Sequence, residues 1–168
     1  MSISMYQASV PVLVRGLTSL QGILGKAEAH AAEKQIDPSV FVNARLFPDM
    51  LPLARQIYIA TDTAKGCAAR LAGVEPPKYD DVEVTFEDLR ARIQKTIDYL
   101  KEFNTAQIDG TEERQITLKM RSGPLEFSGV SYLLQFVLPN FFFHVTTAYD
   151  ILRHNGVELG KLDYLGGR

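Results

Sequence analysis

Residues 127–149 contain no aspartate, glutamate, lysine or arginine, and this uncharged stretch limits how the chain can fold. A helix that is apolar on all sides lies either in a protein core or in a membrane. In a membrane span, the polar side chains of Gln135, Asn140 and Thr147 would sit in hydrocarbon, so we expect a core helix and no membrane partner. Pro139 should kink this helix. The stripe expected to face inward has alternating spacings of four and three residues: Val130, Leu134, Val137, Phe141, His144, Ala148 and Ile151.

Two earlier segments show the spacing of helices that pack in a bundle. The first covers about residues 3–32 and contains Pro11, which should bend its early turns or delay its start. The second has an apolar face over residues 53–71 and is expected to begin near residues 46–49. Gly73 should end this second helix as a glycine C-cap.

Thr85 and Asp88 have the spacing of a capping box and predict the start of a third long helix. Its apolar side chains are expected to face the core: Phe86, Leu89, Ile93, Leu100 and Phe103. Its charged side chains are expected to face water: Arg90, Arg92, Lys95, Asp98, Lys101 and Glu102.

A short segment before the uncharged stretch has the pattern of a β-hairpin. Residues 115–119 alternate polar and apolar side chains, residues 122–124 read Ser-Gly-Pro, and residues 125–127 resume the alternation. An isolated hairpin is marginal in water, so this one should lie on the helices. The chain is therefore predicted to be all-α: a four-helix bundle with a small β-hairpin between the third and fourth long helices. We expect residues 1–168 to form a single domain.

Composition and charge argue against several classes of function. The net charge is −2 and the pI is about 5.9, so no nucleic-acid partner is expected. The single cysteine, Cys67, has no partner for an internal disulfide and removes any cysteine-based metal cluster. The N-terminus lacks the basic start, apolar run and cleavage site of a signal peptide. We therefore expect a cytoplasmic protein.

His144 is the one imidazole on the apolar stripe, and three interpretations of it remain open. It is a neutral core histidine bonded to a buried hydroxyl, carbonyl or acid, or a metal ligand, or an acid/base group. A metal would need two or three further ligands, but the residue one turn later is Ala148. Acid/base chemistry would pair the imidazole with Asp62, Tyr58 or Tyr132. These three residues and His144 are the candidates for a ligand pocket, and no metal site is predicted.

Two blocks of the sequence resemble an uncharacterised bacterial family of domains of unknown function. Residues 46–66 contain Leu-Phe-Pro-Asp-Met-Leu-Pro-Leu-Ala-Arg-Gln-Ile and Ala-Thr-Asp-Thr-Ala-Lys-Gly. Residues 138–156 contain Leu-Pro-Asn-Phe-Phe-Phe-His-Val-Thr-Thr-Ala-Tyr and Leu-Arg-His-Asn-Gly. That family is grouped with the DinB/YfiT-like four-helix bundles, and the resemblance covers nearly the whole chain.

The resemblance implies a metal site that this sequence matches only in part. Many DinB-like proteins hold a divalent metal by three histidines, one from the second helix and two, four residues apart, from the fourth. Some of them are thiol-dependent transferases. Here only His144 matches, because Ala148 lies four residues on and the second long helix contains no histidine. We therefore expect a degenerate metal site, with neither metal nor cofactor.

DinB-like bundles also resemble one another in dimerising through helix faces. Phe141, Phe142 and Phe143 cannot all face one core, so an apolar face of the last helix is expected to form a homodimer. We expect a non-metal protein that binds a small ligand or a partner, with His144 facing inward. The alternative is a DinB-like metal-dependent transferase or hydrolase with an altered ligand set.

Overall fold

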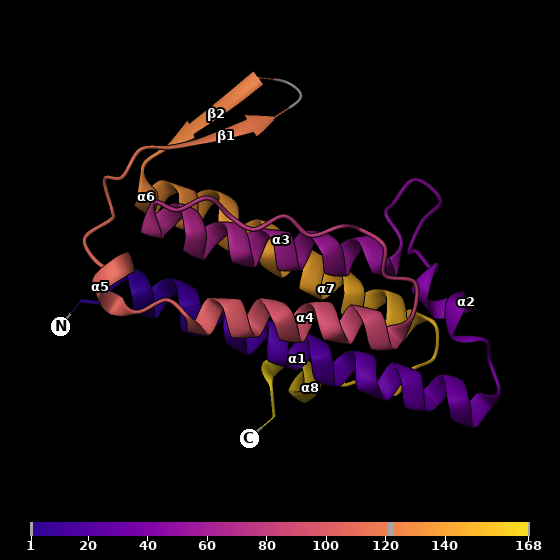
Figure 1. The fold of residues 1–168 in the computed structure, drawn as a ribbon. Helices are drawn as coiled ribbons and strands as arrows, with labels where there is room; N and C mark the ends of the chain where they lie inside the picture. Colours follow the sequence, from indigo (N-terminus) through magenta and orange to yellow (C-terminus); the bar gives the residue numbers. More distant parts are fainter. Residues whose placement is uncertain (1, 121–122, 168) are drawn as a thin grey trace.

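The computed structural model describes residues 2–120 and 123–167, and its long helices form a bundle (Figure 1). It confirms the predicted all-α fold with one small hairpin. The long helices are α1 (Met5–Lys34), α3 (Leu53–Ala72), α4 (Phe86–Lys101) and α7 (Leu138–His154). The shorter elements are α2 (Pro38–Val42), α5 (Thr105–Ile108), β1 (Ile116–Met120), β2 (Gly123–Phe127), α6 (Gly129–Ser131), the π-helix η1 (Tyr132–Val137) and α8 (Lys161–Leu165). Among the described residues, no helix combines the length and the apolar character that a bilayer crossing requires.

Helix α1 starts at a capping box and continues through a proline. The Ser4 hydroxyl accepts from the Gln7 N–H at 3.3 Å, and the Ser4 N–H donates to the Gln7 side chain at 3.1 Å. This arrangement pairs backbone groups that a helix start otherwise leaves free, so the helix begins ahead of Pro11. Further along, α1 approaches α7 closely at a glycine. A Cβ atom added at Gly16 would lie 2.5 Å from Cε1 of Phe141.

Helix α3 begins later than its sequence pattern predicted. The expected start at residues 46–49 is wrong, since the helix begins at Leu53, directly after Pro52. The ring of Pro52 disfavours helical backbone at the preceding residue, and Leu51 there is 43% exposed. The C-terminal end is as predicted. Gly73 has a φ of 76°, the left-handed conformation of a glycine C-cap.

A strap of residues 74–85 runs back along α3 and connects it to α4 (Figure 1). The predicted capping box closes the strap, with the Thr85 hydroxyl accepting from the Asp88 N–H at 3.1 Å. The apolar side chains that were predicted to face the core are all buried, including Phe103, which lies just after the end of α4. The prediction that Arg92 faces water is wrong. Only 3% of this residue is exposed, because acidic residues of the strap cover that side of α4.

The predicted β-hairpin is confirmed. Strands β1 and β2 pair antiparallel, with Ile116 opposite Phe127 and Leu118 opposite Leu125. Ile116 and Leu118 are buried and belong to the hydrophobic core, so apolar contacts hold the hairpin on the bundle. It lies where α3 ends and α6 begins (Figure 1). Ser122, part of the predicted turn, lies outside the described residues.

The uncharged stretch folds as α6, η1 and α7 in succession and is not one regular α-helix. The π-helical turns of η1 come just before Pro139, whose ring would clash with the carbonyl four residues earlier in a regular α-helix. A π-helix turns less per residue than an α-helix, so Leu134 leaves the predicted inward stripe and is 53% exposed. Leu133 is buried in its place. The stripe from Val137 to Ile151 is buried as predicted.

Candidate functional site

His144, on α7, is held by a hydrogen bond to α3. Its Nδ1 lies 2.7 Å from Oε1 of Gln56, and the two residues are only 8% and 2% exposed. Nε2 of Gln56 donates to the carbonyl of Leu51 at 2.8 Å, which leaves the amide oxygen facing the imidazole. An amide oxygen only accepts hydrogen bonds, so Nδ1 of His144 holds the proton. In the neutral ring Nε2 is then the acceptor.

Burial sets the protonation state of this imidazole. It lowers the pKa of His144 from its ordinary value of 6.5, because a low-dielectric surrounding penalises the imidazolium. The ring of Phe143, edge-on with its centre 5.2 Å away, adds to the apolar surrounding. His144 is therefore neutral at pH 7 and donates to Gln56 through Nδ1.

The groups around His144 do not fit a divalent metal ion. Metal sites of this kind need several imidazole, thiolate or carboxylate ligands that converge. The facing helix offers the amide of Gln56, and the next turn of α7 offers Ala148. The preceding turn offers Asn140, whose side-chain amide donates to Thr63 at 2.8 Å. Within residues 2–120 and 123–167, no three His, Cys, Asp or Glu side chains are placed to hold a metal ion.

Two other predicted site residues, Tyr58 and Asp62, lie together at a buried arginine. Nη2 of Arg92 is 3.0 Å from Oδ1 of Asp62, and its guanidinium carbon is 4.7 Å from the Tyr58 ring centre. The Tyr58 hydroxyl donates to the backbone carbonyl of Glu83. Burial first, and then the charge of Glu83, raises the pKa of Tyr58. Neither Tyr58 nor Asp62 hydrogen-bonds His144.

All the donors of this arginine are occupied. Nε donates to the Thr61 hydroxyl at 2.8 Å and Nη1 to the carbonyl of Asp80 at 3.0 Å. The remaining N–H groups meet carboxylates of α3 and the strap, and only 1% of the side chain is exposed. We call this group the Arg92 cluster: Arg92, Asp62, Asp81 and Glu83. It ties α3, α4 and the strap together and has no free donor for a substrate.

Tyr132, the last predicted site residue, lies on η1 and contacts α3 at Arg70, away from Gln56 and His144. Its hydroxyl accepts a hydrogen bond from Nη1 of Arg70 at 3.1 Å. Burial raises the pKa of Tyr132 to about 12 and that of the nearby Cys67 thiol to about 12. Both groups are therefore neutral at pH 7, so neither acts as a base or a nucleophile there. Tyr132 does not hydrogen-bond His144.

Sequence reasoning missed Gln56 and Arg92. Gln56 lies three residues after Leu53 and next to Ile57, on the apolar side of an amphipathic helix. A position on the apolar face predicts that the side-chain amide is buried. Arg92 gave no such signal, because the strap that covers it is brought there only by the fold.

The chain also matches known proteins. Residues 5–165 match a domain of unknown function, DUF1993. Among solved structures, the chain is similar to a DinB family member protein from Shewanella denitrificans, with 42% sequence identity and a TM-score of 0.91. That likeness covers 97% of this chain and 92% of the other. No curated protein matches the chain. The predicted resemblance to an uncharacterised DinB-like family is confirmed.

Proposed function

This chain belongs to the DUF1993 family and has a DinB-like fold, and we propose that it is a metal-free binding protein. It takes a small ligand and works as a homodimer. The hydrogen bond between His144 and Gln56 is the observation on which the metal-free proposal rests. Where the DinB-like triad has three histidines, this chain offers one imidazole, one amide and the methyl group of Ala148. The Nδ1 atom of the imidazole is already used by the amide.

The free nitrogen of His144 supports a role in binding. Nε2 hydrogen-bonds to none of the described residues. The buried side-chain atoms left without a partner in the described part of the chain are Ser19 Oγ and Arg90 Nε. Since Nε2 is not among them, water or a ligand can reach it. A neutral ring held in one tautomer would offer this nitrogen as an acceptor to a ligand's donor group.

A second observation supports the homodimer. The exposed positions of η1 and of the first half of α7 form a stripe without charged side chains, which ends before the exposed Asp150: Leu134, Gln135, Pro139, Phe143 and Thr146. Leu134 and Phe143 on this stripe are 53% and 57% exposed. Depletion of charge and enrichment in aromatic rings are typical of interface centres. Pairing of one such face with its own copy would give a two-fold symmetric dimer.

Metal analysis of protein purified without an affinity tag tests the proposal. We expect far less than one equivalent of nickel, zinc or another divalent metal per chain, and no further loss in His144→Ala. His154→Ala, at an exposed position, is the matched control. One tightly held equivalent that His144→Ala removes would overturn the proposal. It would favour the alternative, a DinB-like metal-dependent transferase or hydrolase with an altered ligand set.

We also propose a cytoplasmic location. Cys67 is the single cysteine, and its thiol is free and fully buried. Chains that keep a free thiol and use no disulfide framework are typical of reducing compartments. Fractionation of the native host cells would test this location, and recovery from a membrane or secreted fraction would contradict it.

A further inference from the structure

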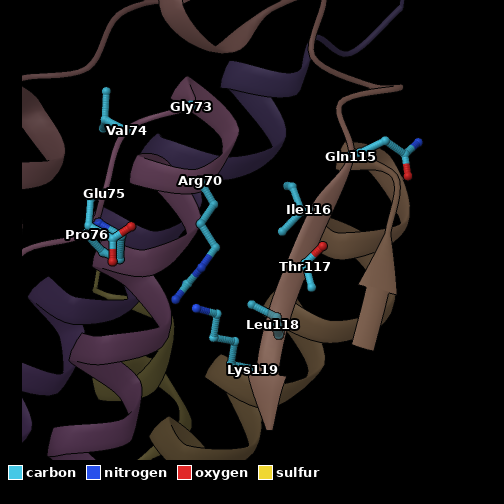
Figure 2. Close-up of a pocket in the computed structure, with 10 residues that line it drawn as sticks. All are labelled: Arg70, Gly73, Val74, Glu75, Pro76, Gln115, Ile116, Thr117, Leu118 and Lys119. Carbon is cyan, nitrogen blue, oxygen red and sulfur yellow. The ribbon is translucent and has the colours of Figure 1, made fainter. Parts of the chain in front are cut away.

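A groove lies between the C-terminal turn of α3 and strand β1 (Figure 2). Its volume is about 490 Å³. That volume falls within the range of roughly 300–1,000 Å³ that is usual for small-molecule sites. The last turn of α3 and the start of the strap line one side, and residues 115–119 line the other. The groove and His144 lie toward opposite ends of α3, since Arg70 follows Gln56 by roughly 20 Å of helical rise.

Arg70 is positioned at this groove by two neighbours. Its Nη1 donates to the hydroxyl of Tyr132 at 3.1 Å. Gly66, one turn earlier on α3, leaves room for the guanidinium, because a Cβ atom there would lie 2.2 Å from the same Nη1. A side chain held in this way loses less conformational freedom when it binds a ligand.

Two more cations surround the groove. In Figure 2 the ends of Arg70 and Lys119 point into the same space between α3 and β1. The guanidinium of Arg114 lies against Gly73, where a Cβ atom would be 2.3 Å from Nη1. In the described part of the chain, none of these three cations forms an ion pair with a carboxylate, although Glu75 also lines the groove. These three cations therefore have no directly bonded carboxylate within that part of the chain.

We propose that this groove binds a small organic anion, with its carboxylate or phosphate group between Arg70 and Lys119. A guanidinium presents a fork of donors that matches either group, and a lysine adds a point charge. Val74, which is 49% exposed, and Pro76 offer apolar contact to the body of the ligand. This site is separate from His144, so it extends the proposed function to the chemical class of a ligand. It rests on the proposal that the chain is a binding protein.

Titration of the isotope-labelled full chain, followed by amide NMR, tests the proposal with four probes. Phenyl phosphate and benzoate are expected to shift the amides of residues 70–75 and 115–119. Inorganic phosphate should bind more weakly because it lacks an apolar body. Benzyl alcohol should leave the groove unchanged because it lacks a charge. The tighter of the first two probes tells whether the groove prefers a phosphate or a carboxylate.

Variants distinguish binding in the groove from nonspecific attraction between the anion and surface cations. Arg70→Gln and Lys119→Gln are each expected to weaken phenyl phosphate binding about tenfold, the effect of losing one charge-assisted hydrogen bond. Gly66→Ala keeps every charge but displaces the guanidinium, so it should weaken binding as well. Lys161→Gln, at an exposed lysine on α8, is the matched control and should bind like the parent.

Several outcomes would contradict the proposal that the groove binds an organic anion. One is that neither organic anion binds at millimolar concentration. Another is that the parent, Arg70→Gln and Lys119→Gln bind phenyl phosphate with equal affinity. Shifts centred on His144 and Gln56 would also overturn it, while leaving the proposed binding function intact. A tightly held metal would overturn the metal-free part of the proposed function and would leave the binding role, on which the groove rests, untouched. Lys119 is exposed, so its variant keeps the test decisive even if Arg70→Gln fails to fold.

Discussion

Nη1 of Arg92 lies 3.2 Å from each carboxylate oxygen of Glu83, so an arginine of α4 fixes the strap. Only 1% of the arginine side chain and 16% of the glutamate side chain are exposed. Attraction between buried charges is largely offset by their lost hydration, so such a pair adds little net stability over an apolar one. Losing one partner is costly, because the other charge stays buried. Arg92 therefore matters chiefly for where the strap lies.

Arg92→Met is expected to lower the free energy of unfolding by about 3 kcal/mol. Methionine fills much of the space but leaves Glu83 without a cation, while Asp62 and Asp81 keep their ion pairs with Lys65 and Arg55. We expect the low end of the effect for buried pairs, because Asp62 and Asp81 are 46% and 35% exposed. Urea denaturation at neutral pH measures the loss.

Arg90→Met is the matched control on the same helix. Arg90 pairs with Glu28 at 2.8 Å, and each side chain is 43% exposed. Exposed pairs contribute little, so this variant should lose less than about 1 kcal/mol. Equal losses in the two variants would contradict the role given to the Arg92 cluster.

Features fixed by local sequence were predictable from the residues alone. The capping box at Thr85 and the glycine C-cap at Gly73 depend on neighbours within one helical turn. The spacing of apolar residues also placed His144 on the buried face. The same reasoning gave the wrong prediction for Leu134, because the π-helix before Pro139 changes the rotation per residue. Analysis of periodicity assumes that each residue turns the helix by the same angle.

Features that depend on chain segments brought together by folding were not predictable. Arg92 lies among charged neighbours in the sequence, and only the strap makes its position a buried one. His144 faces Gln56 from a helix distant in sequence, so its partner could not be read from spacing. Asp62, Tyr58 and Tyr132 were candidates by residue type, and the structure places them at other contacts.

His144→Gln is expected to reduce the loss of stability in acid. Burial lowers the pKa of His144 from 6.5. Between the lowered pKa of the folded chain and pH 6.5, the unfolded chain therefore binds a proton that the folded chain does not. The contribution of this group is complete above about pH 6.5 and is lost as the pH falls through the folded pKa. Urea denaturation between about pH 7 and pH 5 should therefore show a steeper loss in the parent than in the variant.

A second substitution tests the sign of this effect. Gln56→Glu places a carboxylate beside Nδ1, which favours the imidazolium and should raise the pKa of His144 above that in the parent. An NMR titration of the imidazole measures both values. His154→Gln changes an exposed histidine and is the control for the stability series. An unchanged pKa in Gln56→Glu would contradict the hydrogen bond.

Gly16→Ala is expected to destabilise the bundle by about 1–3 kcal/mol through overpacking. The new methyl group would meet the ring of Phe141, which is fully buried, so the ring could shift only by disturbing the packing around it. Gly22→Ala, on the same helix, adds a methyl group with nothing within 4 Å. That control should gain up to about 1 kcal/mol from helix propensity. Thermal denaturation of both variants would show opposite shifts, and two shifts of the same sign would contradict the close approach of α1 and α7.

Cys67 is expected to resist thiol reagents in the folded protein. Burial raises its pKa to about 12, and the residue is fully buried, so almost no thiolate is present or accessible at neutral pH. Ellman's reagent should label no thiol in the native chain and one thiol per chain in guanidinium chloride. Any slow labelling without denaturant should occur only through transient unfolding, so its rate should follow the rate or the extent of unfolding. Immediate labelling without unfolding would contradict the buried position.

Phe143→Glu is expected to convert the proposed homodimer into a monomer. Phe143 is 57% exposed in the single chain, so the substitution should leave the fold intact while placing a charge in the uncharged stripe. At the centre of a two-fold interface, two such charges would lie close together without partners, which strongly disfavours association. Sedimentation velocity at micromolar concentration should show a dimer for the parent and a monomer for the variant. Val82→Glu, at a valine of the strap that is 72% exposed, is the control and should remain dimeric. A parent chain that sediments as a monomer would refute the dimer, and a dimeric Phe143→Glu would move the interface to another face.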